Sequence, residues 1–213
     1  MKLYSGPLSL FSAKARIALG EKGIDHQLIQ VGWSRAAAYE PHHPEVVALN
    51  PKRQVPVLVD GDVVVCDSTL ILEYLEERRP DPPLFPTGTA ERARCRAQEW
   101  AADEVWFPHL WTLIAARVYG SGSEETVPAA VRALDEHARV HDRALGARDY
   151  FCGAFTVADI GSFVFLSTAV ALGAPLPDDV PAVAAWLDRV AARPAVAAVM
   201  QDVNAAAARL LAA

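Results

Sequence analysis

The first part of the chain alternates short apolar runs with one amphipathic segment. Residues 2–4 and 26–31 are typical of short strands, and residues 12–22 between them have helical spacing closed by Gly23. A strand, a helix and a strand within about 30 residues form a βαβ unit, which places the two strands parallel. Residues 32–53 are less regular and contain one short helix.

The stretch from residue 54 to 75 combines a hairpin with a helix. Residues 57–59 and 63–66 are apolar strands on either side of an Asp-Gly-Asp turn signal at 60–62. Asp67 and Ser68 then open a helix, because the apolar residues that follow have the spacing of a core-facing stripe: Leu70, Ile71, Tyr74 and Leu75. The pattern predicts a β-α-β-(α)-β-β-α domain.

The remainder of the chain has helical periodicity throughout. Residues 80–89 are rich in proline and predict a linker. Helices are then expected over about 90–119, with a kink at Pro108, and over 127–145, 157–172, 181–193 and 194–211. The predicted fold class is therefore α/β plus all-α: a domain over 1–79, a linker over 80–89 and an all-helical domain over 90–213.

Composition limits the classes of function. The 213 residues are 52% hydrophobic and 22% charged, which predicts a folded chain. A net charge of −6 argues against general nucleic-acid binding. The longest uncharged run, 160–177, contains glycine, serine, threonine and proline, so we expect a buried helix and its exit and no membrane span.

The N-terminus lacks signal-peptide features, and the three cysteines are scattered, so we expect a cytoplasmic protein. Cys66, Cys95 and Cys152 form no Cys-x-x-Cys pair and no metal spacing, which favours free thiols in the core and no metal site.

Two joints around the hairpin carry the candidate chemistry. A helix that opens at Asp67-Ser68 exposes unpaired N–H groups, which suit an anion. A cis bond between Val55 and Pro56 would turn the backbone of Val55 outward to pair with an extended peptide. Together the two joints would hold a small acidic peptide, although an ordinary N-cap beside a trans proline fits the same residues.

The chain resembles the cytosolic glutathione transferases over nearly its whole length, most closely the serine-type, bacterial members near the zeta, tau and phi classes. The resemblance rests on residues 50–58 (NPKRQVPVL) and 67–75 (DSTLILEYL), on the capping-box segment 155–159 (FTVAD), and on 181–194. It implies a thioredoxin-like first domain, a helical bundle domain that supplies the electrophile pocket, glutathione as co-substrate, a homodimer and a role in detoxification.

The resemblance also implies roles for individual residues. The backbone of Val55 would pair with the cysteinyl part of glutathione, and Ser68 would hold the γ-glutamyl carboxylate. Asp67 would lie near the ammonium group, although Glu or Gln is commoner there. Gln54, with His42 or Arg53, would meet the glycyl end. The implied glutathione-binding residues are His42, Arg53, Gln54, Val55, Pro56, Asp67 and Ser68.

Counting back from the family's Arg-Ile pair, here Arg16-Ile17, puts the catalytic hydroxyl at Ser9, with Ser12 as the fallback donor or N-cap. Tyr4 is expected in the first strand. A free thiol has a pKa of about 8.5, so a hydroxyl aimed at the sulfur would favour the thiolate. The segment 9–12 contains no cysteine, which disfavours disulfide exchange, and no His/Asp partners that would favour a hydrolase triad.

The aromatic stretch 99–111 is expected to line the electrophile pocket, although core packing explains each single aromatic residue there. The pocket residues implied are Phe11, Trp106, Phe107, Leu110 and Trp111, with Ile114 beside them. Glutathione-dependent isomerisation or dehalogenation on the same site stays open. A non-catalytic member that acts as a protein-binding adaptor, for instance at RNA polymerase, stays open as well.

Overall fold

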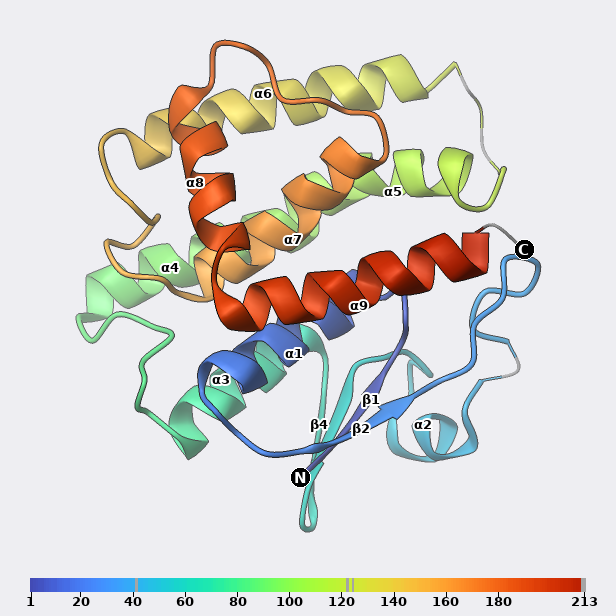
Figure 1. Ribbon diagram of the computed structural model, residues 1–213. Coiled ribbons are helices and arrows are strands. Elements are labelled where there is room, and N and C mark those ends of the chain that lie inside the picture. Colours follow the sequence, from blue (N-terminus) through green and yellow to red (C-terminus); the bar gives the residue numbers. More distant parts are fainter. Residues whose placement is uncertain (41, 122, 124, 212–213) are drawn as a thin grey trace. The chain divides into compact units, whose positions relative to one another are not determined.

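The structure is a computed structural model that describes residues 1–40, 42–121, 123 and 125–211. The chain divides into two compact units, one formed by Met1–Pro83 with Pro194–Ala213 and the other by Leu84–Arg193. Figure 1 shows the elements of both.

The first unit is built on a four-stranded mixed sheet. Its elements are β1 (Lys2–Ser5), α1 (Leu10–Glu21), β2 (Gln27–Gln30), α2 (Pro44–Leu49), β3 (Val57–Asp60), β4 (Val63–Cys66) and α3 (Ser68–Arg78). The strand order is β2-β1-β3-β4, with β1 parallel to β2 and antiparallel to β3, and β3 antiparallel to β4. The predicted order of strands and helices is confirmed.

The pairing of β1 with β3 sorts the core residues onto the two faces of the sheet. Tyr4 lies opposite Val57, and both belong to one buried cluster with Val31 and Val46. Leu3 lies opposite Leu58, so alternation along the strands puts this pair on the other face. Helices α1 and α3 pack on each other and contribute further fully buried residues: Ala15, Ile17, Ala18, Leu19, Ile71 and Leu75.

Helix α9 (Pro194–Leu211) also belongs to the first unit and lies along α1 (Figure 1). The two helices approach closely at Gly20, where an added Cβ would lie 2.9 Å from the Cβ of Ala195. An ion pair between Arg16 and Asp202 joins them as well. This grouping differs from the predicted helical domain over 90–213, because periodicity identifies a helix but not the surface that it covers. Residues 212–213 of that predicted domain lie outside the described residues.

The second unit is all-helical. It contains α4 (Thr89–Ala101), the π-helical turn η1 (Ala102–Trp106), α5 (Phe107–Arg117), α6 (Val127–Leu145), α7 (Val157–Ala171) and α8 (Pro181–Ala191). Helix α7 is buried on nearly every side, and α4, α5 and α8 pack against it. An all-round apolar helix is typical of a buried position, so the predicted buried helix within 160–177 is confirmed. In the described part of the chain, no helix has the length and apolar character needed to cross a membrane.

The long helix predicted over 90–119 is divided into three pieces. Proline 108 lies at the start of α5, and the preceding turn is π-helical, with the N–H of Phe107 bonded to the carbonyl of Ala102. A proline in a helix removes one backbone donor and clashes with the preceding turn. The predicted irregularity at Pro108 is therefore present, and it takes the form of an inserted π-turn.

Part of the predicted linker is packed into the second unit. Leu84 and Phe85 are buried, and the N–H of Val157 donates to the carbonyl of Leu84 at 3.0 Å. The guanidinium of Arg92 covers the ring of Phe85 at 4.7 Å. The segment after Pro83 is thus anchored, although it forms no helix until Thr89.

Candidate active site

The strand register gathers the predicted site at one edge of the sheet. Val57 pairs with Cys66 in the antiparallel hairpin, so continuing that register brings Val55-Pro56 alongside Asp67-Ser68. Tyr4 pairs with Val57 in the same way, which carries the chain after β1 to this edge. The loop before α1, the joint before β3 and the start of α3 therefore meet.

Ser9 is the N-cap of α1, and its hydroxyl oxygen accepts a hydrogen bond from the N–H of Ser12 at 3.1 Å. Helix α1 begins at Leu10, earlier than the predicted residue 12, because Ser9 supplies the cap. The hydroxyl of Ser9 is half-buried and keeps its own proton to donate. The N-terminal turn of α1 adds the positive end of a helix dipole beside it.

Ser12 has a different environment. Its side chain is fully buried, and its oxygen accepts a hydrogen bond from the N–H of Gly6 at 3.2 Å. This bond ties the first turn of α1 to the loop that leaves β1. The geometry favours Ser9 as the donor to a ligand and Ser12 as the residue that shapes the loop.

The joint at Val55 presents backbone groups. The Val55–Pro56 bond is cis, which is one of the two alternatives that the sequence left open. The Val55 side chain packs against the buried cluster that contains Tyr4 and Val57. Within the described residues, no hydrogen bond of the chain uses the backbone N–H or C=O of Val55. An extended peptide can therefore pair with this residue as an added strand does.

Asp67 and Ser68 form the start of α3. Asp67 is the N-cap, and its carboxylate accepts a hydrogen bond from the N–H of Thr69 at 2.9 Å. Its φ of 85° lies in a region that a residue other than glycine adopts only when its surroundings hold it there. Ser68 is the first helical residue and is buried, so its N–H and hydroxyl lie where the helix leaves donors without intrahelical partners.

The residues predicted for the glycyl end of the peptide lie on the segment before β3 and the loop before α2. Gln54 and Arg53 are exposed, and Arg53 has a φ of 56°. His42 is half-buried and pairs with Glu40 at 2.7 Å. Gln54 directly precedes Val55, so its side chain is the nearest of these along the chain to the joint.

Sequence reasoning assigned no role to Asn50, which organises this segment. Its side-chain amide donates to the carbonyl of Gln54 at 2.7 Å, and its oxygen accepts from the N–H of Lys52 at 3.0 Å. The residue is buried. An Asn-Pro pair at a turn was the available signal, because asparagine side chains bond to backbone groups of nearby residues.

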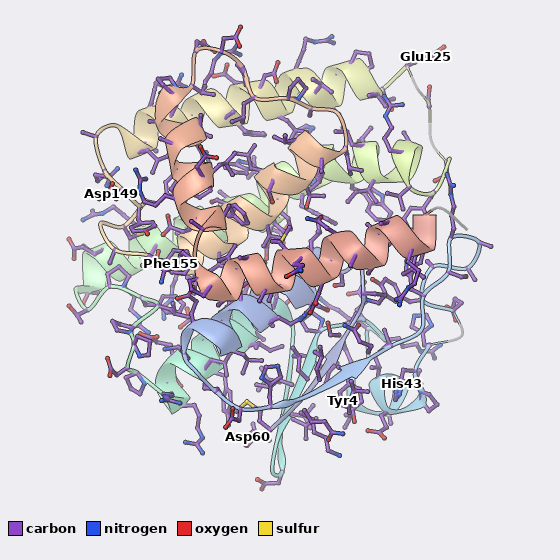
Figure 2. All side chains as sticks on the ribbon, in the orientation of Figure 1. Tyr4, His43, Asp60, Glu125, Asp149 and Phe155 are labelled. Carbon is purple, nitrogen blue, oxygen red and sulfur yellow. The ribbon has the colours of Figure 1, made fainter. Side chains whose placement is uncertain are left out.

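Tyr4 lies in β1 as predicted and is buried in one cluster with Val31, Val46 and Val57. Its ring contacts that of His43, with centroids 5.5 Å apart (Figure 2). His43 is in turn the N-cap of α2. Both residues therefore have structural roles.

The predicted aromatic wall divides into core and accessible members. Trp106 is buried against His137 and His141, with ring centroids 5.5 and 3.5 Å away, and Leu110 is fully buried. Phe107 packs on Phe165 at 5.5 Å and keeps some exposure, while Trp111 is 48% exposed. In the first unit, Phe11 is half-buried on α1. Trp106 and Leu110 are core residues, and Phe107 and Trp111 keep surface that a small molecule can contact.

Comparison with known proteins identifies the family. The model of the glutathione S-transferase N-terminal domain matches residues 3–83, and the model of the C-terminal domain matches residues 97–194. The chain therefore belongs to the glutathione S-transferase family, and its fold is the thioredoxin-like domain plus helical domain that the resemblance implied.

Three relatives show the range of the family around this chain. The chain is 32% identical to a stringent starvation protein A homologue of Coxiella burnetii, covering 75% of this chain and 71% of that protein. It is 41% identical to glutathione S-transferase Z1 of Arabidopsis thaliana, but covers only 41% of that protein and 44% of this chain. A sphingomonad glutathione S-transferase solved in complex with glutathione superposes with a TM-score of 0.79 at 27% identity, covering 96% of this chain and 99% of that one.

Proposed function

We propose that this protein is a glutathione transferase that activates the glutathione thiol for addition to a hydrophobic electrophile. The observation that carries the proposal is the meeting of three joints at one sheet edge: the Ser9 cap, the backbone of Val55 and the start of α3 at Ser68. Each supplies a kind of group that a thiol tripeptide needs. Family membership and the glutathione-bound sphingomonad structure support it.

The roles follow from the chemistry of the peptide. The backbone of Val55 pairs with the cysteinyl residue, and Ser68 with the N-terminus of α3 binds the γ-glutamyl carboxylate. Asp67 faces the ammonium group. Gln54 is the first candidate for the glycyl carboxylate, with Arg53 and His42 as further candidates. The sulfur then lies near Ser9.

Ser9 acts on the sulfur as a hydrogen-bond donor and is not a nucleophile. Lowering the thiol pKa by about two units needs roughly 2.7 kcal/mol of extra interaction with the thiolate. A hydrogen bond to a charged group contributes about 1.5–3 kcal/mol, and the helix dipole adds about 0.3–1 kcal/mol. One hydroxyl at the N-terminus of α1 is therefore sufficient.

The Ser9→Ala variant tests the proposal. Its turnover with a chloronitrobenzene electrophile should fall roughly tenfold or more, while its affinity for glutathione stays nearly unchanged. Ser9→Thr, which keeps the hydroxyl and the cap, is the matched control and should retain most of the turnover. Equal turnover in Ser9→Ala and the parent protein would remove Ser9 from the mechanism.

A second candidate is a member without catalysis that binds another protein. The similarity to the stringent starvation protein A homologue, which extends over more of the chain than the similarity to the Arabidopsis transferase, favours it. Failure to bind glutathione in a calorimetric titration would favour this candidate over the transferase. Isomerisation or dehalogenation with glutathione would use the same site, and a panel of electrophiles distinguishes these reactions from conjugation.

A further inference from the structure

The loop that carries Ser9 is closed by a cycle of hydrogen bonds. The N–H of Ser9 donates to the carbonyl of Gly6 at 3.2 Å, so residues 6–9 form a β-turn, with Pro7 at the position where proline is favoured. The N–H of Gly6 donates to the Ser12 hydroxyl at 3.2 Å, and the N–H of Ser12 donates to the Ser9 hydroxyl at 3.1 Å. Gly6 therefore holds Ser9 both directly and through Ser12.

Gly6 has no room for a side chain, because Tyr39 lies against it. An added Cβ at Gly6 would be 2.5 Å from the hydroxyl oxygen of Tyr39, 2.6 Å from its Cε1 and 2.7 Å from its Cζ. Gly6 does not have a positive φ, so its backbone conformation is open to other residues. The close approach of Tyr39 is what requires a glycine at this position.

Tyr39 is itself anchored to the sheet. Its side chain packs against the buried cluster of Tyr4, Val31, Val46 and Val57. Its hydroxyl oxygen is shielded from solvent, although the residue as a whole is only half-buried. A side chain held in this way cannot simply swing aside when the turn moves.

The backbone around Tyr39 is held as well. Tyr39 lies between β2 and α2, where the N–H of Ser34 donates to the carbonyl of Ala38 at 2.8 Å. The N–H of Glu40 donates to the carbonyl of Ala37 at 2.9 Å. The sequence predicted an irregular segment here and no role for Tyr39. The structure shows that this segment supports the turn before α1.

We propose that Tyr39 is a positioning residue for thiol activation, whose ring fixes the turn at Gly6 and thereby holds the Ser9 hydroxyl where it meets the sulfur of glutathione. The inference rests on the proposed function. Tyr39 acts through Gly6 and needs no contact with the reacting atoms. Misplacement of a catalytic group by about 1 Å can cost up to about a hundredfold in rate, so the effect of losing this support is measurable.

Two substitutions of Tyr39 form a matched pair. Tyr39→Leu removes the three atoms that face Gly6 and keeps an apolar side chain for the buried cluster, whereas Tyr39→Phe keeps Cε1 and Cζ. With chloronitrobenzene as the electrophile, turnover of Tyr39→Leu should fall roughly tenfold, while its affinity for glutathione stays nearly unchanged. Tyr39→Phe should retain most of the turnover.

The pKa of bound glutathione is the readout that a merely structural role would not move. It is measured from the ultraviolet absorbance of the thiolate over a pH series at saturating glutathione. The parent protein should lower the thiol pKa below its ordinary value of about 8.5, and Tyr39→Leu should return it toward that value. Tyr39→Phe should give a pKa close to that of the parent protein.

Gly6 provides a second test that does not depend on Tyr39→Leu alone. Gly6→Ala should lower turnover and raise the pKa of bound glutathione, because the new Cβ and the Tyr39 ring cannot both keep their places. Gly6→Ala/Tyr39→Leu should regain turnover relative to Gly6→Ala, because the clashing atoms are gone. Losses that simply add in the double variant would overturn the proposal.

Hydrogen exchange of the ligand-free protein tests the support of the turn without any chemistry. The amides of residues 6–12 should exchange faster in Tyr39→Leu than in the parent protein, and Tyr39→Phe should match the parent protein. Equal exchange in all three proteins would overturn the proposal.

The pKa measurement also separates this inference from the proposed function. If the parent protein lowers the thiol pKa and Tyr39→Leu lowers it equally, the inference alone is overturned. If the parent protein binds no glutathione or leaves the thiol pKa near about 8.5, the proposed function is overturned and the inference with it.

Discussion

At the scale of single residues, two serines three positions apart have separate tasks. Ser9 uses its oxygen to cap α1 and keeps a proton that it can donate, whereas the buried Ser12 fixes the loop after β1 through the N–H of Gly6. Loss of the Ser12 hydroxyl should therefore act on stability, since the N–H of Gly6 would be left without its partner in the core.

Ser68 should control the affinity for glutathione. A hydrogen bond to a charged group contributes about 1.5–3 kcal/mol, so Ser68→Ala should weaken glutathione binding roughly tenfold to a hundredfold. Isothermal titration calorimetry measures this directly. Thr69→Ala, one residue further along α3, is the matched control and should bind as the parent protein does. Unchanged affinity in Ser68→Ala would exclude Ser68 as the carboxylate ligand.

His141 should make the stability of the second unit depend on pH. Its Nδ1 lies 3.1 Å from the carbonyl of His137, so this nitrogen carries the proton, and Nε2 accepts from the amide of Gln98. The pKa of His141 is lowered to about 3, chiefly by burial; repulsion from His137 acts in the same direction, and the bond to the His137 carbonyl opposes both. A second proton would face the Gln98 donor and the ring of Trp106 in the core.

The sign of the dependence follows from this lowered pKa. The unfolded state binds the proton near pH 6.5, but the folded state does so only near pH 3, so stability is complete above about pH 6.5 and falls below it. The loss from this group should approach about 1.4 kcal/mol per pH unit. Urea denaturation of the parent protein and of His141→Gln at pH 7 and pH 5 measures it. The free energy of unfolding should fall more between pH 7 and pH 5 in the parent protein than in His141→Gln. An equal fall in the two proteins would contradict a neutral buried His141.

At the scale of elements, a buried ion pair joins the ends of α1 and α3. Lys22 is almost completely buried, and its ammonium group lies 2.7 Å from the carboxylate of Glu76. The same ammonium donates to the carbonyls of Arg79 at 2.7 Å and Pro82 at 2.9 Å. All three donor hydrogens of the ammonium group are satisfied in this way.

Lys22→Met should destabilise the protein by about 3–5 kcal/mol, because it removes the ammonium group that faces the buried Glu76 carboxylate. Chemical denaturation measures the change. In the double variant Lys22→Met/Glu76→Leu the buried charge is gone, and much of the stability should return. A single variant as stable as the parent protein would show that the pair makes no net contribution.

The secondary-structure elements could be predicted from the sequence more completely than the contacts between them. The strands and most helices follow from local periodicity, and Pro108 signals the break before α5. The sequence offered Ser12 as a possible N-cap of α1, and only the fold after β1 shows that Ser9 is the cap. The grouping of α9 with α1 depends on the close approach at Gly20, and a long-range contact of this kind leaves no periodic signal.

The candidate site was predictable to a similar degree. The motif around Val55 and Ser68 is local, and the register of β3 with β4 then places both at one edge. The role of Asn50 was not predicted, because its bond to the Gln54 carbonyl depends on the shape of the intervening turn. The sequence did not predict which of the aromatic residues expected in the electrophile pocket are core residues. Trp106 is in the core because it packs on His137 and His141.

At the scale of the whole molecule, the proposed function assigns the thiol peptide to the first unit, and in the helical second unit Phe107 and Trp111 keep accessible aromatic surface. We expect the active species to be a homodimer, as the family resemblance implies. Light scattering of the purified protein should then give twice the chain mass of 23.0 kDa. A monomer with full conjugating turnover would contradict that expectation.

The most direct test of the central claim is a calorimetric titration of the full-length protein with glutathione, repeated with ophthalmic acid, which has a methyl group in place of the thiol. The account predicts saturable binding with one site per chain for both peptides. It also predicts release of the thiol proton with glutathione alone, seen as a dependence of the heat on the buffer's ionisation enthalpy. Absence of saturable heat with either peptide, or the same buffer dependence for both, would contradict a site that binds glutathione and ionises its sulfur.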